Sequence, residues 1–504
     1  MTEAVARTPG HPRGLPVLFF AEMWERFSFY GMRALLVFYL TKHWLFSDAV
    51  AAGIYATYGS LVYLTPVIGG LIADRYLGFR KAVMLGAVLL VCGHIGMAVE
   101  GAPAYLDGDV VVRDEGALQI LYLSLALIIV GVGFLKPSIS SIVGQLYAPD
   151  DARRDGGFTL FYMGINLGAM SASLLCGYLG ETYGWAYGFG LAGIGMVFGL
   201  ITFARGRERL EGAGEPAEPA RLEQRVLGPL KLEWLIYLGA VFGVAAAWWL
   251  VQEREVVGTL LGTTGLAAVA GILWFCVARC DRVERDRMLL VLLLTAVSVL
   301  FWALFEQAGT SMSLFADRVV DREVAGTTIA ASQLQSLNPL FIILLAPLFA
   351  WLWVRLGARG AEPATPAKFA FALLQVGLGF AVLVFGIEQA GEDGRVALIW
   401  LVLAYLLHTT GELCLSPVGL SMVTRLSVPR LVGLMMGVWF LASSAAHYVA
   451  GWIAALAAVD GGANADTSSA VAVYAQTFSL VAEVAIVVGL ILLALSKLLK
   501  RLAH

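Results

Sequence analysis

Charged residues recur at helical spacing in the first long apolar stretch of the chain. Glu22, Arg26, Tyr30 and Arg33 follow one another at steps of four, four and three residues, so an α-helix places them on one stripe, with Glu25 beside it. A charge inside a membrane costs about 2.5–3.5 kcal/mol on insertion scales, so such charges are rare and usually functional. The stripe therefore predicts a helix that lines a water-filled cavity. A purely structural ion pair between Glu22 and Arg26 is the alternative interpretation.

Three more charges lie deep in apolar stretches, at Lys136, Glu306 and Glu412. The N-terminal half then holds three deep cations and two acids, and the C-terminal half holds two acids, so a cavity between the halves is bipolar. Such a cavity suits a zwitterion, whose carboxylate is attracted to Arg33 and Lys136 and whose amine is attracted to Glu412. The seven groups carry a net charge of −1, which one bound proton neutralises. This predicts that proton binding and substrate binding are coupled through ion pairs that form and break.

Aromatic, amide and indole side chains near these charges complete the predicted pocket. Each one alone is equally compatible with packing or with an aromatic belt at the membrane surface. As a set, they would accept varied apolar groups while holding the polar ends of a ligand. The set comprises Tyr30, Tyr63, Tyr162, Asn166, Trp302, Asn338 and Trp439.

Composition places these charges in a membrane protein. The 504 residues are 59% hydrophobic and only 14% charged, whereas soluble domains are about 25% charged, and the mean hydropathy is +0.79. Apolar stretches of about 20 residues, the length of a membrane-spanning helix, recur from end to end. The net charge of −3 gives no reason to expect a nucleic-acid partner.

The apolar stretches predict 14 transmembrane helices, as two groups of six around a central pair. This pattern is typical of the major facilitator fold, whose halves rock around a site at the bilayer midplane. We therefore expect an all-α membrane protein with a six-helix bundle at 1–204, a cytoplasmic linker and two additional helices at 205–287, and a second six-helix bundle at 288–504. The predicted helices are 16–41, 50–73, 80–100, 117–145, 157–180, 185–204, 232–252, 257–279, 288–316, 328–356, 367–388, 396–424, 431–458 and 471–497.

Lys and Arg collect in alternate loops, as they do in the cytoplasmic loops of membrane proteins. These loops and the two termini hold most of the 34 Lys and Arg residues, so both termini are predicted to be cytoplasmic. The opposite loops hold only Lys42, Arg113, Arg254, Arg318, Arg322 and Arg395. One cytoplasmic loop, GGLIADRYLGFRK, resembles the superfamily signature between helices 2 and 3, with matches at Asp74, Arg75, Gly78, Arg80 and Lys81.

Six motifs in order resemble those of the proton-dependent oligopeptide transporter family, and the resemblance covers nearly the whole chain. The first-helix motif E-x-x-E-R-F-x-Y-Y-G appears as EMWERFSFYG, with Phe29 in place of a tyrosine. The Lys-Pro-Asn of helix 4 appears as Lys136-Pro137-Ser138. The other motifs are FYMGINLG at 161–168, FWALFEQ at 301–307, Asn338-Pro339, GELCLSP at 411–417, and the helix-11 binding positions Trp439 and Ser443.

The resemblance implies a prokaryotic symporter that imports di- and tripeptides with protons, in the bacterial cytoplasmic (inner) membrane, with no cofactor besides the coupling proton. It implies proton coupling by Glu22, Glu25, Arg26 and Glu306. Two pairs look like the family's gating salt bridges, Arg33–Glu306 and Lys136–Glu412. The predicted peptide contacts are Tyr30, Arg33, Tyr63, Lys136, Tyr162, Asn166, Trp302, Asn338, Glu412, Trp439 and Ser443.

The main alternative is a symporter of another small solute, such as an amino acid, nitrate or a peptidomimetic, because plant relatives of the family transport nitrate. The complete first-helix motif favours peptides. An enzyme is not expected, because the sequence has no nucleophile–base pair and no phosphate-binding loop. The expected surroundings are membrane lipids, and the expected state is a monomer.

The remaining cysteines and histidines that could bind metal or exchange protons are assigned no role in transport. Cys276 and Cys280 are spaced like a metal-binding pair, but no further ligand joins them, so neither a metal site nor a disulfide is expected. Animal members of the family carry a histidine at the position of Ala56, so proton coupling here should not depend on that position. Packing or hydrogen bonding is expected for the intramembrane histidines His94, His408 and His447.

Overall fold

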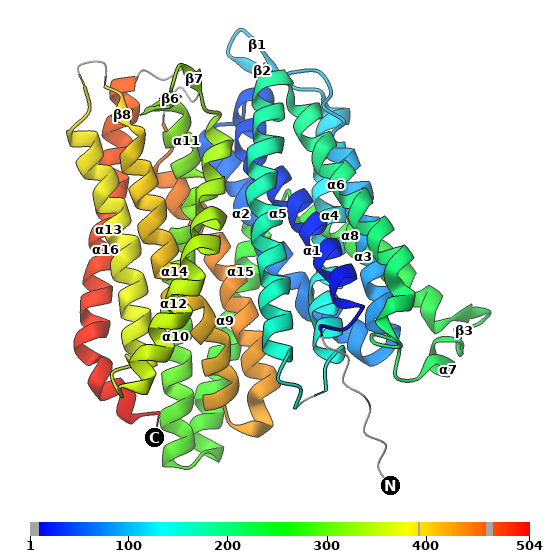
Figure 1. Ribbon diagram of the computed structural model, residues 1–504. Coiled ribbons are helices and arrows are strands. Elements are labelled where there is room, and N and C mark those ends of the chain that lie inside the picture. Colours follow the sequence, from blue (N-terminus) through cyan, green and yellow to red (C-terminus); the bar gives the residue numbers. More distant parts are fainter. Residues whose placement is uncertain (1–9, 149, 392–393, 460–466, 504) are drawn as a thin grey trace.

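The computed structural model describes residues 10–148, 150–391, 394–459 and 467–503, and most of these residues lie in long helices that stand side by side (Figure 1). The helices of the first part of the chain are α1 (Leu15–Phe38), α2 (Asp48–Ile72), α3 (Phe79–Met97), α4 (Glu115–Gln145), α5 (Arg154–Tyr183), α6 (Trp185–Gly206), the short α7 (Pro219–Leu222), α8 (Leu232–Leu250) and α9 (Arg254–Arg279). The later helices are α10 (Arg282–Phe305), α11 (Ser311–Arg318), α12 (Leu337–Ala358), α13 (Thr365–Glu388), α14 (Leu398–Leu426), α15 (Val432–Leu456) and α16 (Thr467–Arg501).

Short strands and turns connect these helices. Two-stranded antiparallel hairpins are formed by β1 (Tyr105–Asp107) with β2 (Val110–Val112), by β3 (Arg225–Leu227) with β4 (Leu230–Lys231), and by β6 (Glu323–Val324) with β7 (Thr327–Thr328). The strands β5 (Val320–Asp321) and β8 (Val396–Ala397) pair in parallel. In Figure 1 both ends of the described chain lie at the lower end of the molecule, and β1, β2 and α11 lie at the upper end.

Polar side chains cap the N-termini of several long helices. Ser47 accepts a hydrogen bond from the Val50 N–H at the start of α2, and Asp281 forms a capping box with Glu284 at the start of α10. Asp114 accepts from the Ala117 N–H at 3.1 Å at the start of α4. The Ala117 and Ala102 N–H groups hold the pKa of the Asp114 carboxyl below its usual range.

In the described residues, 13 helical segments are long and apolar enough to cross a membrane. The charged helix α1 is not one of them. It lies inside the first bundle, where it packs against α5 and α6, so its stripe is shielded from lipid. The chain is therefore an all-α membrane protein in which the helix with charges along its middle, α1, has an interior place.

Two α-helices are shorter than predicted because a 3₁₀ turn replaces part of each predicted helix. The predicted helix 288–316 begins earlier, at Arg282, and ends at Phe305, where a 3₁₀ turn covers Glu306–Gly309 before α11 begins. The predicted helix 328–356 opens with a 3₁₀ turn before α12. At the first break the Gly309 backbone packs directly against the ring of Tyr55, and a side chain at that position would collide with it. This close contact with α2 was not visible in the apolar pattern.

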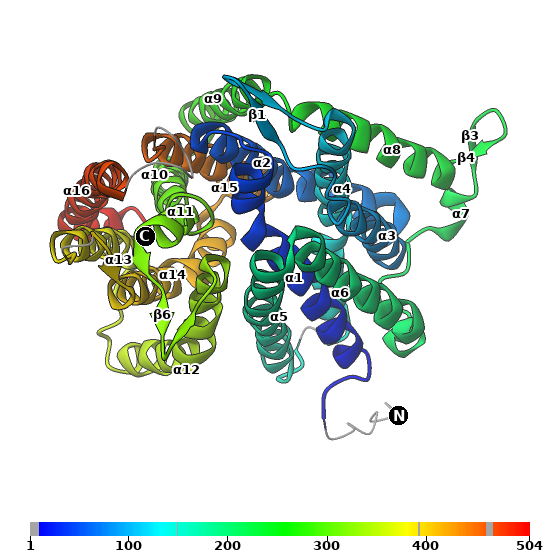
Figure 2. The same cartoon turned by 90° about the horizontal axis from the view of Figure 1, so that it is seen from above.

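The chain forms two groups of helices with separate apolar cores (Figure 2). One core is built from residues between Leu15 and Leu261, and the other mainly from residues between Met288 and Leu499. Of the central pair, α8 packs on α4, whereas α9 packs on α15 and α2. The pair thus contacts both groups. The division of the chain at residues 204 and 287 stays a prediction.

A close helix crossing holds the first bundle together. Gly69 of α2 lies directly against the backbone of Gly133 in α4, and a β-carbon at residue 69 would collide with that carbonyl group. Small residues allow such approaches in membranes, where packing rather than the hydrophobic effect drives helix association. Thr65, one turn earlier, donates to the Ile129 carbonyl at 2.9 Å across the same crossing.

Gly69→Val should force α2 and α4 apart and lower the unfolding midpoint of the purified protein. Overpacking of this kind costs about 1–3 kcal/mol, which corresponds to a fall of roughly 1–3 °C in a thermal melt of a chain of this length in detergent. Gly271→Val on α9 is the matched control, because a β-carbon there meets open space. Equal midpoints for the two variants would contradict the proposed importance of the crossing.

Candidate functional site

Three charged side chains of α1 form one buried cluster. Arg26 donates from Nη2 to Glu25 Oε1 at 2.7 Å and from Nε to the other Glu25 oxygen, and the same Nε lies 3.2 Å from Glu22 Oε1. All three residues are at most 3% exposed. The cluster has two acids and one cation, and Glu22 Oε2 has no hydrogen-bond partner in the described part of the chain. This free carboxylate oxygen is the natural place for a proton that balances the charge.

Arg33 joins the two halves of the chain. Its Nη2 is bound to Glu306 Oε2, and its Nε donates to the Tyr55 hydroxyl at 2.5 Å. The 3₁₀ turn after α10 carries Glu306, and Gln307 beside it anchors the turn by donating to the Ala450 carbonyl at 3.0 Å. The predicted Arg33–Glu306 contact is therefore present in this conformation, and it links α1 with the end of α10.

Lys136 and His447 lie on either side of Tyr63. The Lys136 ammonium lies 4.5 Å from the centroid of the Tyr63 ring, at cation–π distance. The His447 ring stacks on the same tyrosine at 4.5 Å with an interplanar angle of 29°, and His447 Nδ1 lies 3.6 Å from Glu306 Oε2. Tyr63 and His447 thus connect Lys136 of α4 with Glu306, the acid that binds Arg33.

The predicted Lys136–Glu412 salt bridge is not formed in this conformation within the described residues, so its role as a gating pair stays a prediction. Glu412 accepts a hydrogen bond from Asn338 Nδ2 at 3.0 Å, and the same amide group donates to Thr409 at 3.1 Å. No ion pair between Lys136 and Glu412 occurs in the described residues. The two charges come from α4 and α14, and each is held by a neighbour of its own, Lys136 by the Tyr63 ring and Glu412 by Asn338.

Two adjoining cavities collect the predicted binding residues. The larger holds about 390 Å³ and the smaller about 290 Å³, and Tyr63, Lys136, Trp302 and Glu306 line both, so we call them together the central chamber. Other predicted residues that line the chamber are Tyr30, Arg33, Tyr162, Asn166, Asn338, Glu412, Trp439 and Ser443. Glu22, Glu25 and Arg26 do not line it, and are buried behind it in α1.

Several chamber residues were missed by the sequence reasoning. His447 was expected only to pack or hydrogen-bond, yet it lines the chamber beside Glu306. The sequence did contain an indication that His447 lines the chamber, because Trp439, Ser443 and His447 recur at steps of four and therefore share one face of α15. Ser416 was missed in the same way, four residues after Glu412 on α14. His408 also lines the chamber.

A second group of ion pairs ties the two halves at the upper end, and we call it the upper ion-pair layer. Arg318 binds Asp48 through two hydrogen bonds of 2.6 and 2.7 Å, and Asp48 is only 2% exposed. The Val459 N–H donates to the same carboxylate at 3.1 Å. Nearby, Lys42 Nζ lies 2.8 Å from Asp317. From the sequence, Lys42 and Arg318 were only loop cations, because their partners lie about 270 residues away along the chain.

Many membrane-spanning helices around a charged central chamber define a solute transporter of the major facilitator type rather than an enzyme. Residues 80–468 match the family model described as the POT family. The chain is 38% identical over 504 residues to the uncharacterized transporter YclF of Bacillus subtilis, covering 98% of this chain and 95% of that protein. It is 35% identical over 510 residues to a di-/tripeptide transporter of Lactococcus lactis, covering 97% and 96%.

Solved structures agree with this assignment. A crystal structure of a mutant of the peptide transporter POT in complex with alafosfalin matches with a TM-score of 0.80 and 38% identity, covering 98% of this chain and 96% of that one. The protein belongs to the POT family of membrane transporters. The predicted fold class and family are thereby confirmed.

Arg318→Gln should destabilise the conformation described here, because it leaves the buried Asp48 carboxylate without its cation. Breaking one partner of a buried ion pair costs about 3–5 kcal/mol, and a thermal melt of the purified protein measures the loss. The double change Asp48→Asn with Arg318→Gln should regain part of the stability. Arg430→Gln, which removes an exposed pair with Glu284, is the control and should change the midpoint little. Equal losses from Arg318→Gln and Arg430→Gln would contradict the importance of the layer.

Proposed function

We propose that the protein is a proton-coupled symporter that imports di- and tripeptides by alternating access. The observation that carries the proposal is the bipolar central chamber. Arg33 and Lys136 line it from α1 and α4, and Glu412 lines it from α14. A short peptide is a zwitterion with a carboxylate at one end and an ammonium at the other, so this charge distribution attracts both of its ends.

The peptide carboxylate takes the place of an internal partner. In the conformation described here Arg33 is bound by Glu306, and the Lys136 ammonium lies over the Tyr63 ring. A proton on Glu306 removes the negative charge that holds Arg33 and leaves the guanidinium available for the peptide carboxylate. Asn338 holds Glu412 so that its other oxygen can accept from the peptide ammonium. Aromatic walls from Tyr30, Tyr162 and Trp302 accept side chains of different shape.

The cluster of Glu22, Glu25 and Arg26 supplies the second proton-binding position. Arg26 lies between two carboxylates and balances only one of them. A proton on Glu22 leaves Arg26 and Glu25 as a neutral pair, whereas loss of the proton restores the excess negative charge. Because the cluster lies on the same helix as Arg33, its charge state biases the position of α1 between the two conformations.

The distribution of Lys and Arg supports a cytoplasmic position for both termini in a bacterial inner membrane. The upper ion-pair layer then lies on the outer side and holds that side closed. Residues 1–204 and 288–504 act as the two rocking bodies around the chamber, with the part at 205–287 between them. The proposed functional unit is the monomer, because all the chamber residues come from one chain.

Relatives support a peptide substrate. One similar protein, 38% identical over 467 residues, is the peptide transporter YePEPT of Yersinia enterocolitica. A second candidate function is symport of another small zwitterion. A POT family transporter, 30% identical to this chain, was crystallised in complex with 5-aminolevulinic acid, which favours this possibility.

Uptake into liposomes tests the proposal. Purified protein is reconstituted, an inward proton gradient is imposed, and accumulation of labelled dialanine is measured with and without unlabelled trialanine or a protonophore. We expect accumulation that both trialanine and the protonophore suppress. Accumulation that the protonophore does not change argues against proton coupling. A lack of competition by trialanine, with uptake of 5-aminolevulinic acid, supports the second candidate instead.

Glu22→Gln should reduce gradient-driven dialanine uptake to background, because the substituted residue cannot bind and release the coupling proton. Counterflow exchange of dialanine across vesicles without a gradient should continue, since the peptide contacts are unchanged. Glu483→Gln is the matched control, because this glutamate of α16 is exposed and lies outside the chamber. Normal gradient-driven uptake by the Glu22 variant would refute the assigned role.

Glu412→Ala should weaken peptides with a free amino end more than peptides with a blocked one. The carboxylate is the only acid of the chamber besides Glu306 in the described residues, so its loss removes the partner of the peptide ammonium. We expect an increase in KM of about tenfold or more for dialanine. The inhibition constant of N-acetylated dialanine should remain near the wild-type value. Equal losses for both peptides would assign Glu412 to gating alone.

A further inference from the structure

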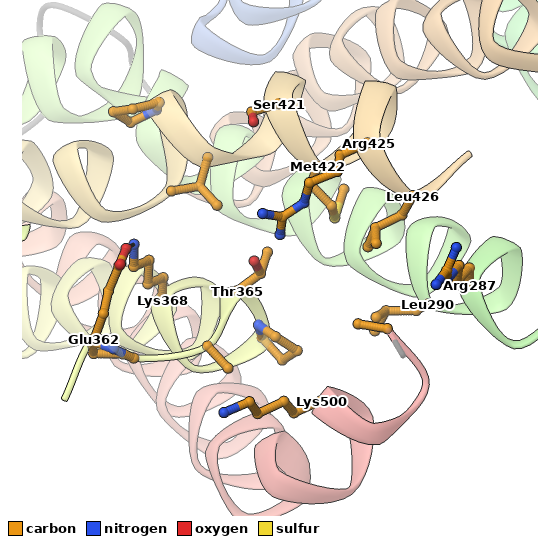
Figure 3. Close-up of a pocket in the computed structure, with 16 residues that line it drawn as sticks. Arg287, Leu290, Glu362, Thr365, Lys368, Ser421, Met422, Arg425, Leu426 and Lys500 are labelled. Carbon is orange, nitrogen blue, oxygen red and sulfur yellow. Dashed lines mark hydrogen bonds and ion pairs between the residues drawn. The ribbon is translucent and has the colours of Figure 1, made fainter. Parts of the chain in front are cut away.

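A separate basic cavity lies at the lower end of the second helix group, away from the central chamber (Figure 3). It has a volume of about 600 Å³. Its walls come from the first turns of α10, the segment before α13 with the first turn of that helix, the last turns of α14, and the end of α16. No residue of this cavity lines the chamber.

Four cations surround the cavity, and only one acid accompanies them. Figure 3 shows Arg425 above the hollow, Lys500 below it, Arg287 on one side and Lys368 with Glu362 on the other. Lys368 is only 6% exposed and forms an ion pair with Glu362, so this pair is internally balanced. The other three cations form no ion pair within the described residues, and Arg287 Nε is buried without a hydrogen-bond partner.

The beginning of α13 adds to the positive character of the cavity. Thr365 is the first residue of this helix, and its N–H is the one donor left over in the first turn within the described residues, because Pro366 has no N–H and the Ala367 N–H donates to the Ala364 carbonyl at 2.9 Å. Both Ala364 and Thr365 line the cavity. The positive end of the helix dipole therefore supplements the three unbalanced side chains and does not act alone.

Apart from the hydroxyl groups of Thr365 and Ser421, the rest of the wall is apolar. Leu290 lies on α10, and Val418, Met422 and Leu426 lie on α14. A dissolved phosphate ion would gain nothing from these side chains, whereas an amphiphile with an anionic head and alkyl chains would contact both kinds of wall. The cavity also opens where the helices end, which is the depth at which lipid head groups lie. Basic pockets between transmembrane helices are typical sites for anionic head groups.

We propose that this cavity binds the phosphate head group of an anionic membrane phospholipid. The phosphodiester lies among Arg287, Arg425 and Lys500, and an acyl chain follows the apolar side of α14. α14 also carries Glu412, which lines the chamber, and α10 leads directly into the turn with Glu306. A bound lipid would therefore stabilise the packing of these two helices at the lower end of the second bundle. This binding site is independent of the transported substrate.

Lipid binding by the purified full-length protein tests the proposal. Phosphatidylglycerol and phosphatidylcholine with the same acyl chains are titrated separately into delipidated protein in detergent, and bound lipid is counted by native mass spectrometry. Inorganic phosphate is tested in parallel by its ability to displace phosphatidylglycerol. We expect phosphatidylglycerol to bind at least about tenfold more tightly than phosphatidylcholine, since each nearby cation favours an anionic lipid. Inorganic phosphate at the same concentration should not displace it.

The triple variant Arg287→Gln, Arg425→Gln, Lys500→Gln should lose this preference. The matched control is Arg282→Gln, Lys497→Gln, Arg501→Gln, which removes three exposed cations from α10 and α16 that do not line the cavity, and it should keep the preference. Lys500→Gln alone changes an exposed residue near the end of α16, so it should fold normally and weaken phosphatidylglycerol binding about fivefold.

Three outcomes would overturn the proposal. The first is equal affinity of the wild-type protein for the two lipids. The second is an equal loss of preference in the two triple variants, which would indicate attraction by the whole basic surface. The third is displacement of the lipid by inorganic phosphate at equal concentration, which would assign the cavity to a dissolved anion.

Discussion

Charge burial in a membrane is the constraint on which the rest of this structure depends, because each buried charge needs a partner of opposite sign or several hydrogen bonds. Arg26 satisfies this need within one helix, between Glu22 and Glu25. Arg33 satisfies it across the molecule, through Glu306. Three structural features position these charges. They are the 3₁₀ turn after α10, the packing of Tyr55 against Gly309, and the interior place of α1.

Among the described residues, the ion pairs that join the two halves are distributed unequally between the two ends of the molecule. Asp48 with Arg318 and Lys42 with Asp317 tie the halves at the upper end. Nearer the lower end, Lys136 and Glu412 face the chamber without touching each other. A buried pair contributes little net stability when its desolvation is counted, but it is very sensitive to loss of one charge. Such pairs suit a protein that alternates between two conformations of similar free energy.

Much of the architecture could be predicted from local patterns. Hydropathy located most of the long helices to within a few residues, because the length of an apolar stretch is a property of the chain itself, but it misplaced the end of α10 and the start of α12. The stripe of Glu22, Arg26, Tyr30 and Arg33 indicated an interior face, and the structure buries Glu22 and Arg26 and places Tyr30 and Arg33 on the chamber. The end of α10 at Phe305 was not predicted, because the apolar stretch continues past it and only the structure shows the 3₁₀ turn, with Gly309 against Tyr55 of α2.

The sequence by itself determined which kinds of side chain the helices carry and which of them share a face, because helical spacing and hydropathy are local. Helical spacing could not determine which charges of different helices meet, and the Arg33–Glu306 pair was implied only by the family resemblance. Only the tertiary structure decided that Glu306 also lies near His447, that Asn338 rather than Lys136 holds Glu412, and that Asp48 binds Arg318. The choice of partner depends on distances between helices far apart along the chain, and on how the two halves are tilted.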